Sequence, residues 1–127
     1  QGNVKQEIIV PNLVVTTGKN LIASRLKDTT DAAMTHMAIG TGSTAAAAGD
    51  TALGSEAGRV ALTSTTVTNN AVAYVASFGA GTGTGAITEA GLLNASSSGT
   101  LLCRTVFSVI NKGANDTLGI TWTVTIS

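Results

Sequence analysis

The chain has few of the residue types that catalysis and metal binding use. Its 127 residues include one cysteine and one histidine. A single cysteine cannot form a disulfide within the chain, and one histidine with one cysteine does not supply a metal-ligand set. No acid, base and nucleophile converge in the sequence. We therefore expect neither an enzyme nor a cofactor, a metal site or a small-molecule substrate.

The isolated reactive residues have structural interpretations. Cys103 lies within an expected strand, where a small buried core residue explains it better than a nucleophile does. His36 opens another expected strand and is interpreted as a packed or surface residue. Asp28 and Asp31 follow an expected helix, and a weak calcium site is the alternative there to a solvated turn.

Charge is also scarce. Charged residues make up 11% of the chain and the formal net charge is zero, against about 25% charged residues in ordinary domains. Without a basic footprint we expect no nucleic-acid partner. A small domain normally keeps charge on its surface for solubility, so the low charge indicates that much of this surface meets other protein.

Long apolar runs and aromatic residues are missing as well. The longest apolar stretch, 8–15, is interrupted by Pro11 and Asn12 and lacks a signal-peptide cleavage pattern, so we expect no membrane partner. Aromatic residues are only 3% of the chain. A carbohydrate-binding surface would need exposed aromatics, and Tyr74 is the one to test. Trp122 is expected to be a core anchor.

Glycine, by contrast, is abundant, with 15 residues. Two Gly-Thr-Gly loops, 40–45 and 81–86, invite a phosphate-binding interpretation. Neither has the Lys-Ser/Thr ending of a phosphate loop, and neither precedes a helix in a βαβ unit. We interpret both as flexible loops, or as loops that let another chain approach closely.

The periodicity predicts a mainly β protein. Segment 117–126 alternates apolar and polar residues throughout, which is typical of a half-buried strand. Asn69-Asn70 predicts a tight hairpin turn. Thr17 is the expected N-cap of a helix at 18–27 that buries a stripe of apolar residues. The other expected strands are 4–10, continued by 13–16, then 35–40, 59–68, 71–78, 87–93 and 100–109, with one helical turn at 51–54.

These elements predict a single domain spanning 1–127, with 1–10 as an extended arm. The fold class is an antiparallel β-sandwich, jelly-roll-like in the more detailed hypothesis, with one short α-helix near 18–27. A symmetric register of the hairpin 87–109 places Glu89 opposite Arg104 as a structural cross-strand pair. Both faces of this hairpin are apolar, so we expect one to meet the core and the other a neighbouring subunit.

The sequence also resembles a known family. The last third carries the blocks TEAGL, GTLLCRTVFS and ITWTVT, and upstream blocks are NLVVTTGKNLIASRL, MTHMAIGTGSTAAAAGDTALGSE and RVALTS. These blocks, in this order, are similar to small structural virion proteins of tailed bacteriophages, and the similarity covers most of the chain. The family includes capsid decoration (cement) proteins and tail-associated proteins.

The resemblance implies a structural protein on the capsid exterior of the virion. Its expected function is to decorate and cement the shell by bridging neighbouring capsid subunits. The expected partners are the major capsid protein and further copies of the chain, as a dimer or trimer. A tail, baseplate or fibre-attachment subunit is the alternative, and a carbohydrate-binding β-sandwich module is a more remote one.

Particular residues are assigned to these roles. The core anchors are expected to be Trp122, Phe107, Leu101 and Ile120. The residues expected to contact neighbouring subunits are Val4, Ile8, Val10, Leu102 and Val106. The extended ends, 1–10 and 118–127, are expected to add as strands to neighbouring subunits.

Overall fold

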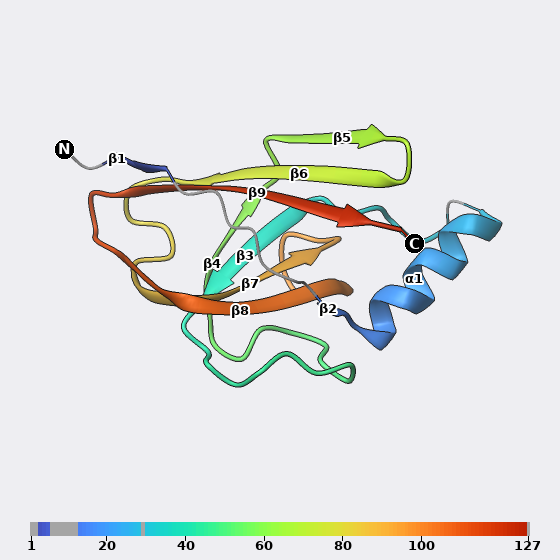
Figure 1. The fold of residues 1–127 in the computed structure, drawn as a ribbon, viewed down its shortest axis with the longest axis horizontal. Coiled ribbons are helices and arrows are strands. Elements are labelled where there is room, and N and C mark those ends of the chain that lie inside the picture. Colours follow the sequence, from blue (N-terminus) through green and yellow to red (C-terminus); the bar gives the residue numbers. More distant parts are fainter. Residues whose placement is uncertain (1–2, 6–12, 29, 127) are drawn as a thin grey trace.

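The computed structural model describes residues 3–5, 13–28 and 30–126, which form nine strands and one helix (Figure 1). One sheet has the strand order β1-β9-β6-β5 and the other the order β2-β8-β7-β3-β4. All neighbouring strands are antiparallel except β1 and β9, which are parallel. The elements are β1 (Asn3–Lys5), β2 (Leu13–Val14), α1 (Thr16–Lys27), β3 (His36–Gly40), β4 (Glu56–Ala61), β5 (Ser64–Thr68), β6 (Ala71–Phe78), β7 (Gly85–Leu93), β8 (Leu101–Lys112) and β9 (Thr117–Thr125).

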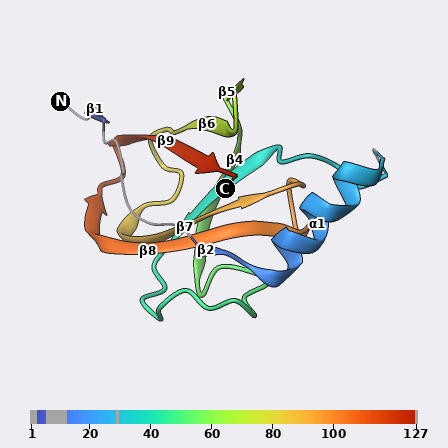
Figure 2. The same ribbon diagram turned by 45° about the vertical axis from the view of Figure 1, so that its right-hand side comes forward.

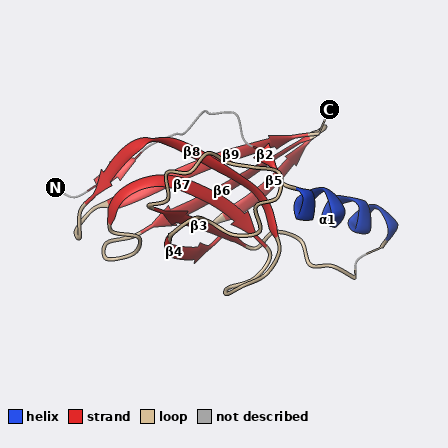
Figure 3. Cartoon of the chain, turned by 90° about the horizontal axis from the view of Figure 1, so that it is seen from below, coloured by secondary structure: helices blue, strands red, loops and turns tan. Residues whose placement is uncertain are grey.

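The two sheets pack as a sandwich around one main apolar core, as the sequence predicted (Figure 1). Seen from below, the strands of the two layers overlap and α1 extends from one end (Figure 3). Phe78, Leu118 and Trp122 enter this core from one sheet, and Met37 and Ile87 enter it from the other. The alternation along β9 is confirmed, since its apolar side chains are buried and most of its threonines are exposed. Leu101, Ile120 and Trp122 are buried, whereas Phe107 is only partly buried against the core.

The chain passes from one sheet to the other between β1 and β2, between β4 and β5, between β6 and β7, and between β8 and β9. The expected strand 59–68 is therefore two strands in different sheets, separated at Leu62 and Thr63. The jelly-roll hypothesis is not confirmed, because a jelly roll has eight strands in two Greek keys and the present order includes a parallel β1–β9 pair.

The β5–β6 hairpin is confirmed around Asn69-Asn70. Asn69 has a φ of 54°, in the left-handed region that asparagine tolerates better than most residues. The register from Thr68↔Ala71 to Ser64↔Val75 is unbroken. The turn is also tied to the end of the chain, because the amide of Ile126 donates to the Asn70 carbonyl at 2.8 Å.

The helix α1 begins at Thr16, and its capping differs from the prediction. Val15 occupies the N-cap position without a side-chain cap, and the Thr17 hydroxyl instead donates to the Leu101 carbonyl of β8 at 3.0 Å. The predicted apolar stripe is also wrong in part. Leu21 is buried, but Leu26 is 84% exposed. The helix lies at one end of the sandwich beside β8 (Figure 2), and its buried residues, Gly18 and Leu21, are in its first half.

The predicted register of β7 and β8 is wrong by two residues. Arg104 lies opposite Gly91, and Glu89 lies opposite Val106. Irregularities between Ile87 and Glu89 and between Leu92 and Leu93 shift the ladder, as β-bulges do. A shift of two residues keeps each side chain on its face, so Glu89 and Arg104 still share a face.

The part of the outer face of β7 and β8 around Glu89 and Arg104 is covered by the chain itself, where a neighbouring subunit was expected, whereas β8 beyond Thr105 is more exposed. The covering segment is 41–55, the connection between β3 and β4, which we call the cover loop. Its Leu53 packs in a second apolar cluster with Val15, Ala38, Leu93 and Leu101. The expected helical turn at 51–54 is absent from this described loop, where the chain forms bends.

Several expected subunit contacts are placed differently. Leu102 is buried in the main core, so it is not available to a partner. Val106 is partly exposed beside Leu13. Val4 lies in β1, which adds to β9 of the same chain opposite Leu118. The other candidates of the predicted arm, Ile8 and Val10, lie outside the described residues.

Candidate functional site

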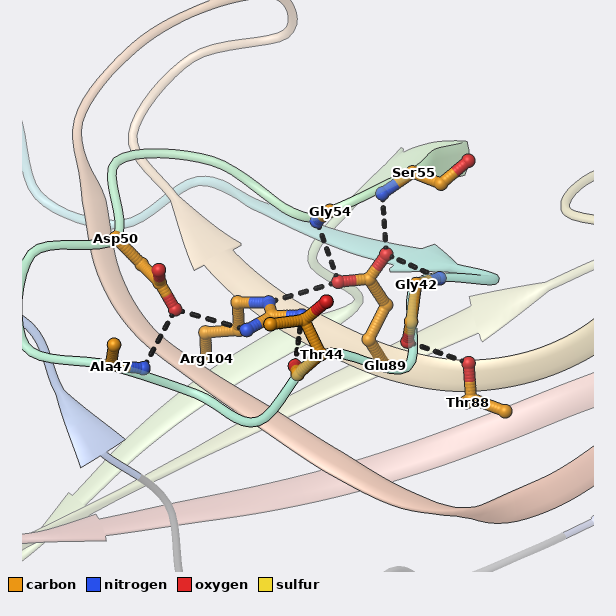
Figure 4. Close-up of polar contacts among 9 residues, drawn as sticks. All are labelled: Gly42, Thr44, Ala47, Asp50, Gly54, Ser55, Thr88, Glu89 and Arg104. Atoms are coloured by element: carbon orange, nitrogen blue, oxygen red, sulfur yellow. Dashed lines mark hydrogen bonds and ion pairs between the residues drawn. The ribbon is translucent and has the colours of Figure 1, made fainter.

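Among the described residues, the ion pair of Glu89 and Arg104 makes an extensive set of polar contacts. Glu89 extends from β7 and Arg104 from β8, and the two side chains point toward one another beneath the cover loop (Figure 4). Arg104 Nε donates to Glu89 Oε1 at 2.9 Å. The side chain of Glu89 is 0% exposed and that of Arg104 is 2% exposed. The sequence predicted this pair, although not its diagonal geometry.

The Glu89 carboxylate also holds both ends of the cover loop. Oε2 accepts hydrogen bonds from the amides of Gly42 at 2.8 Å and Ser55 at 2.7 Å. Oε1 accepts one from the amide of Gly54 at 2.8 Å. The neighbouring Thr88 hydroxyl donates to the Gly42 carbonyl at 2.7 Å. One carboxylate thus joins two segments that lie twelve residues apart in the sequence.

Arg104 holds the middle of the same loop. Its Nη1 donates to Asp50 Oδ2 and its Nη2 to the Thr44 carbonyl, both at 2.9 Å. Asp50 Oδ2 in turn accepts from the amide of Ala47 at 2.9 Å. The planar guanidinium suits this arrangement because it directs several donors at once in fixed directions. Asp50 is the only charged residue of the cover loop.

The first glycine-rich segment is explained by the closeness of this carboxylate. A β-carbon at Gly42 would lie 2.5 Å from Glu89 Oε2, and one at Gly40 would lie 2.6 Å from the same atom. A side chain at either position would push the carboxylate away. The anion that this loop holds is therefore a side chain of the same protein, rather than the phosphate considered from the sequence.

The Glu89–Arg104 pair is stabilised in its charged form, and its polar atoms have hydrogen-bond partners within the protein. Burial alone would raise the pKa of Glu89, but the three loop amides and the Arg104 guanidinium lower it more, so the pKa lies below its ordinary value of 4.5. Among the described residues, no buried side-chain nitrogen or oxygen lacks a hydrogen-bond partner. The arrangement fixes a loop, and its donors and acceptors are occupied by the protein itself.

A second ionic group fixes the turn between β7 and β8. Arg59 of β4 makes a two-pronged contact with Glu56, with distances of 2.8 Å and 2.7 Å. Its Nη1 donates to the carbonyls of Ala95 at 3.0 Å and Ser98 at 2.9 Å. This pair was not predicted from the sequence. Residues three apart, such as Glu56 and Arg59, point to opposite faces of a regular strand. The irregular pairing of β4 with β3 allows the two side chains to meet.

The structure also gives the surroundings of Cys103, His36 and Asp28, which the sequence suggested as reactive or metal-binding candidates. Cys103 is fully buried, and burial raises the pKa of its thiol. His36 Nδ1 lies 2.8 Å from the Thr35 hydroxyl. The Asp28 carboxylate accepts from the amide of Thr30 at 2.9 Å and from Lys27 Nζ at 3.0 Å, and these bonds, first that of Thr30, lower its pKa.

No exposed aromatic platform is found in the described residues. Phe78, Trp122 and Tyr74 are buried, and Phe107 is partly buried against the core. In the same residues no group of three or more His, Cys, Asp and Glu side chains is placed to hold a metal ion. No helix in the described part of the chain is long and apolar enough to cross a membrane.

Comparison with known proteins gives no neighbour. No family model, no curated protein and no solved structure matches this chain.

The surface of the described residues is poor in charge and carries large exposed apolar side chains. Among the charged residues whose burial is described, Glu89, Arg104 and Lys112 are buried. The exposed large apolar side chains are those of Leu26, Val67, Val109 and Ile126. Two of them belong to one end of the molecule, because Ile126 bonds to the turn that ends β5 and Val67 lies in β5 itself.

Proposed function

We propose that this chain is a structural virion protein of a tailed bacteriophage that decorates the capsid and bridges neighbouring capsid subunits. The observation that carries the proposal is the charge-poor exterior. Two of the chain's few charged side chains are buried, because they form the Glu89–Arg104 pair that fixes the cover loop. A small protein with such an exterior gains by covering it with other protein.

The sequence blocks that resemble virion proteins lie on the framework of this fold. TEAGL lies in β7, GTLLCRTVFS leads into and forms most of β8, and ITWTVT lies in β9. The block MTHMAIGTGSTAAAAGDTALGSE contains β3 and the whole cover loop. The resemblance therefore includes Glu89, Arg104 and the loop that they hold, which together make one structural unit.

A cover loop that is anchored at several points and has a long uncharged segment suits a contact surface. Its segment 41–49 contains no charged residue, and its two ends and middle are hydrogen-bonded to the buried pair. A loop that is ordered before binding loses less conformational entropy when a partner docks. Decoration then stabilises the shell by mass action, because the protein binds only the assembled lattice.

The test is to locate the chain in purified virions by cryo-electron microscopy and to count its copies. Many copies spread over the shell support the proposal, and particles stripped of the protein are then expected to rupture at a lower temperature. A few copies confined to the tail would contradict decoration and support the tail, baseplate or fibre-attachment alternative. Absence from the particle would contradict both.

A further inference from the structure

The free edge of β5 differs from the other sheet edges of the described residues. Natural proteins protect exposed edges with charges, prolines, bulges or very short strands, because an open edge recruits further strands. β2 has two residues and leads directly into α1, and β1 has three residues, one of them Lys5. β4 carries Glu56 and Arg59, and its pairing with β3 is irregular.

β5 has none of these protections. It spans five residues, Ser-Thr-Thr-Val-Thr, without charge or proline, and its register with β6 is unbroken. All five residues are exposed. Figure 1 and Figure 2 show β5 at the border of the molecule, outside β6. Its Val67 is 68% exposed and places an apolar side chain at this edge.

The register shows which main-chain groups face outward. Thr68 and Ala71 close the two-residue turn, so the main-chain groups of Thr68, Thr66 and Ser64 are directed toward β6. Those of Thr65 and Val67 are directed toward the free edge, because successive residues alternate. The edge therefore offers two adjacent donor–acceptor sets, centred on Thr66.

We propose that β5 is a self-association site at which two copies pair their β5 strands antiparallel about a two-fold axis through Thr66. In this register Thr65 of one copy bonds to Val67 of the second copy, and the reverse pair is equivalent by symmetry. The edge groups of both strands are satisfied, and the sheet β1-β9-β6-β5 continues into its counterpart. The proposal concerns the isolated chain and does not depend on where it sits in a virion.

A second copy fits this edge because the strand is compatible with itself. At the two-fold axis, a residue of one strand lies opposite the same residue, or one close to it, in the second copy. A charged residue near the axis would therefore lie close to its own like charge in the second copy. The segment 60–70 contains no charged residue. Thr66 faces Thr66, and Thr65 faces Val67, which are pairs that suit a strand. The two Val67 side chains lie on one face, diagonal to each other across the axis.

The experiment measures the mass of the purified full chain by sedimentation velocity across the micromolar range. The wild type is expected to be in a monomer–dimer equilibrium. Thr66→Lys places two like charges on the axis, which is expected to weaken the dimer roughly tenfold or more. Thr123→Lys is the matched control. Like Thr66, Thr123 is exposed and pairs with Ala73 of β6, but it lies on β9, away from the free edge of β5.

A charge exchange identifies the axis itself. Thr66→Lys and Thr66→Glu are each expected to dimerise more weakly than the wild type, and an equal mixture is expected to recover a dimer that contains one copy of each. Circular dichroism checks that each variant is folded. A wild type that stays monomeric overturns the proposal, as does a dimer that Thr66→Lys leaves intact or a mixture that fails to recover it. None of these outcomes bears on the location of the chain in virions.

Discussion

Glu89 and Arg104 form their 2.9 Å ion pair along a diagonal of the β7–β8 ladder, two residues away from direct opposition. Diagonal neighbours on one face of a sheet remain within reach of long side chains. The diagonal also leaves space beside the pair for three amides of the cover loop. The pair therefore serves as the attachment point of a loop as well as a link between strands.

Removing the charge of Glu89 is expected to destabilise the protein strongly. Glu89→Gln replaces one acceptor oxygen by a donor group among four donors and leaves the buried Arg104 short of a counter-charge. Breaking a buried pair on one side typically costs about 3–5 kcal/mol. Glu56→Gln is the matched control, and because Glu56 is more exposed its loss is expected to cost less than about 1 kcal/mol. Urea unfolding measures both, and equal costs would contradict the clamp role of Glu89.

Stability is expected to fall in acid through Glu89. Because the folded-state pKa is lower than its ordinary value of 4.5, the contribution is fully present above that value and is lost as the pH falls through the folded pKa. The free energy of unfolding, measured by urea titration from neutral pH into acid, is expected to drop below pH 4.5. Glu89→Gln is expected to show a shallower drop, and an unchanged slope in this variant would rule out Glu89 as the cause.

Glycine at position 42 is expected to be required by the cover loop. An added β-carbon would lie 2.5 Å from Glu89 Oε2, so Gly42→Ala is expected to displace the carboxylate from its donors. The cost is expected to reach roughly 1–3 kcal/mol, as for buried polar groups that lose their partners. Gly49→Ala is the control, because nothing lies within 4 Å of its added carbon. Amide exchange of Gly54 and Ser55 is expected to quicken in the first variant only.

At Gly18 of α1, replacing glycine by alanine is expected to destabilise the protein, although helices ordinarily favour alanine. In an open helix interior, alanine in place of glycine stabilises by about 1 kcal/mol. At Gly18 an added β-carbon would collide with the Leu102 carbonyl oxygen of β8. Gly18→Ala is therefore expected to lower the melting temperature by forcing α1 away from β8. Ala23→Gly, at an exposed position of the same helix, provides the ordinary cost for comparison, and a stabilised Gly18→Ala would show that α1 does not pack this closely.

Cys103 is expected to be inert in the folded protein. Its thiol is fully buried and burial raises its pKa, so little thiolate forms at neutral or mildly alkaline pH. A thiol reagent such as iodoacetamide is expected to modify the chain only when denaturant unfolds it, which mass spectrometry detects. Modification of the native protein at the rate seen in denaturant would contradict the buried position of this strand.

Local patterns in the sequence predicted several of the strands, a hairpin turn and the helix. Alternation in 117–126 predicted β9, Asn69-Asn70 predicted the β5–β6 turn, and the apolar stripe predicted α1 to within two residues at its start. These features depend on neighbours in the chain. Side-chain direction has a period of two in a strand, and the turn and the helix depend on backbone preferences of a few adjacent residues.

Only the tertiary structure decided what covers the outer face of β7 and β8. The sequence showed two apolar faces and an opposite-charge pair, and the same pattern suits a neighbouring subunit or a folded-back loop. The choice depends on the path of segment 41–55, whose glycines and alanines have no periodicity to predict it. The bulges that set the Glu89–Arg104 diagonal likewise arise from packing between strands. Contacts between distant segments decide such features, and no local pattern in the chain encodes them.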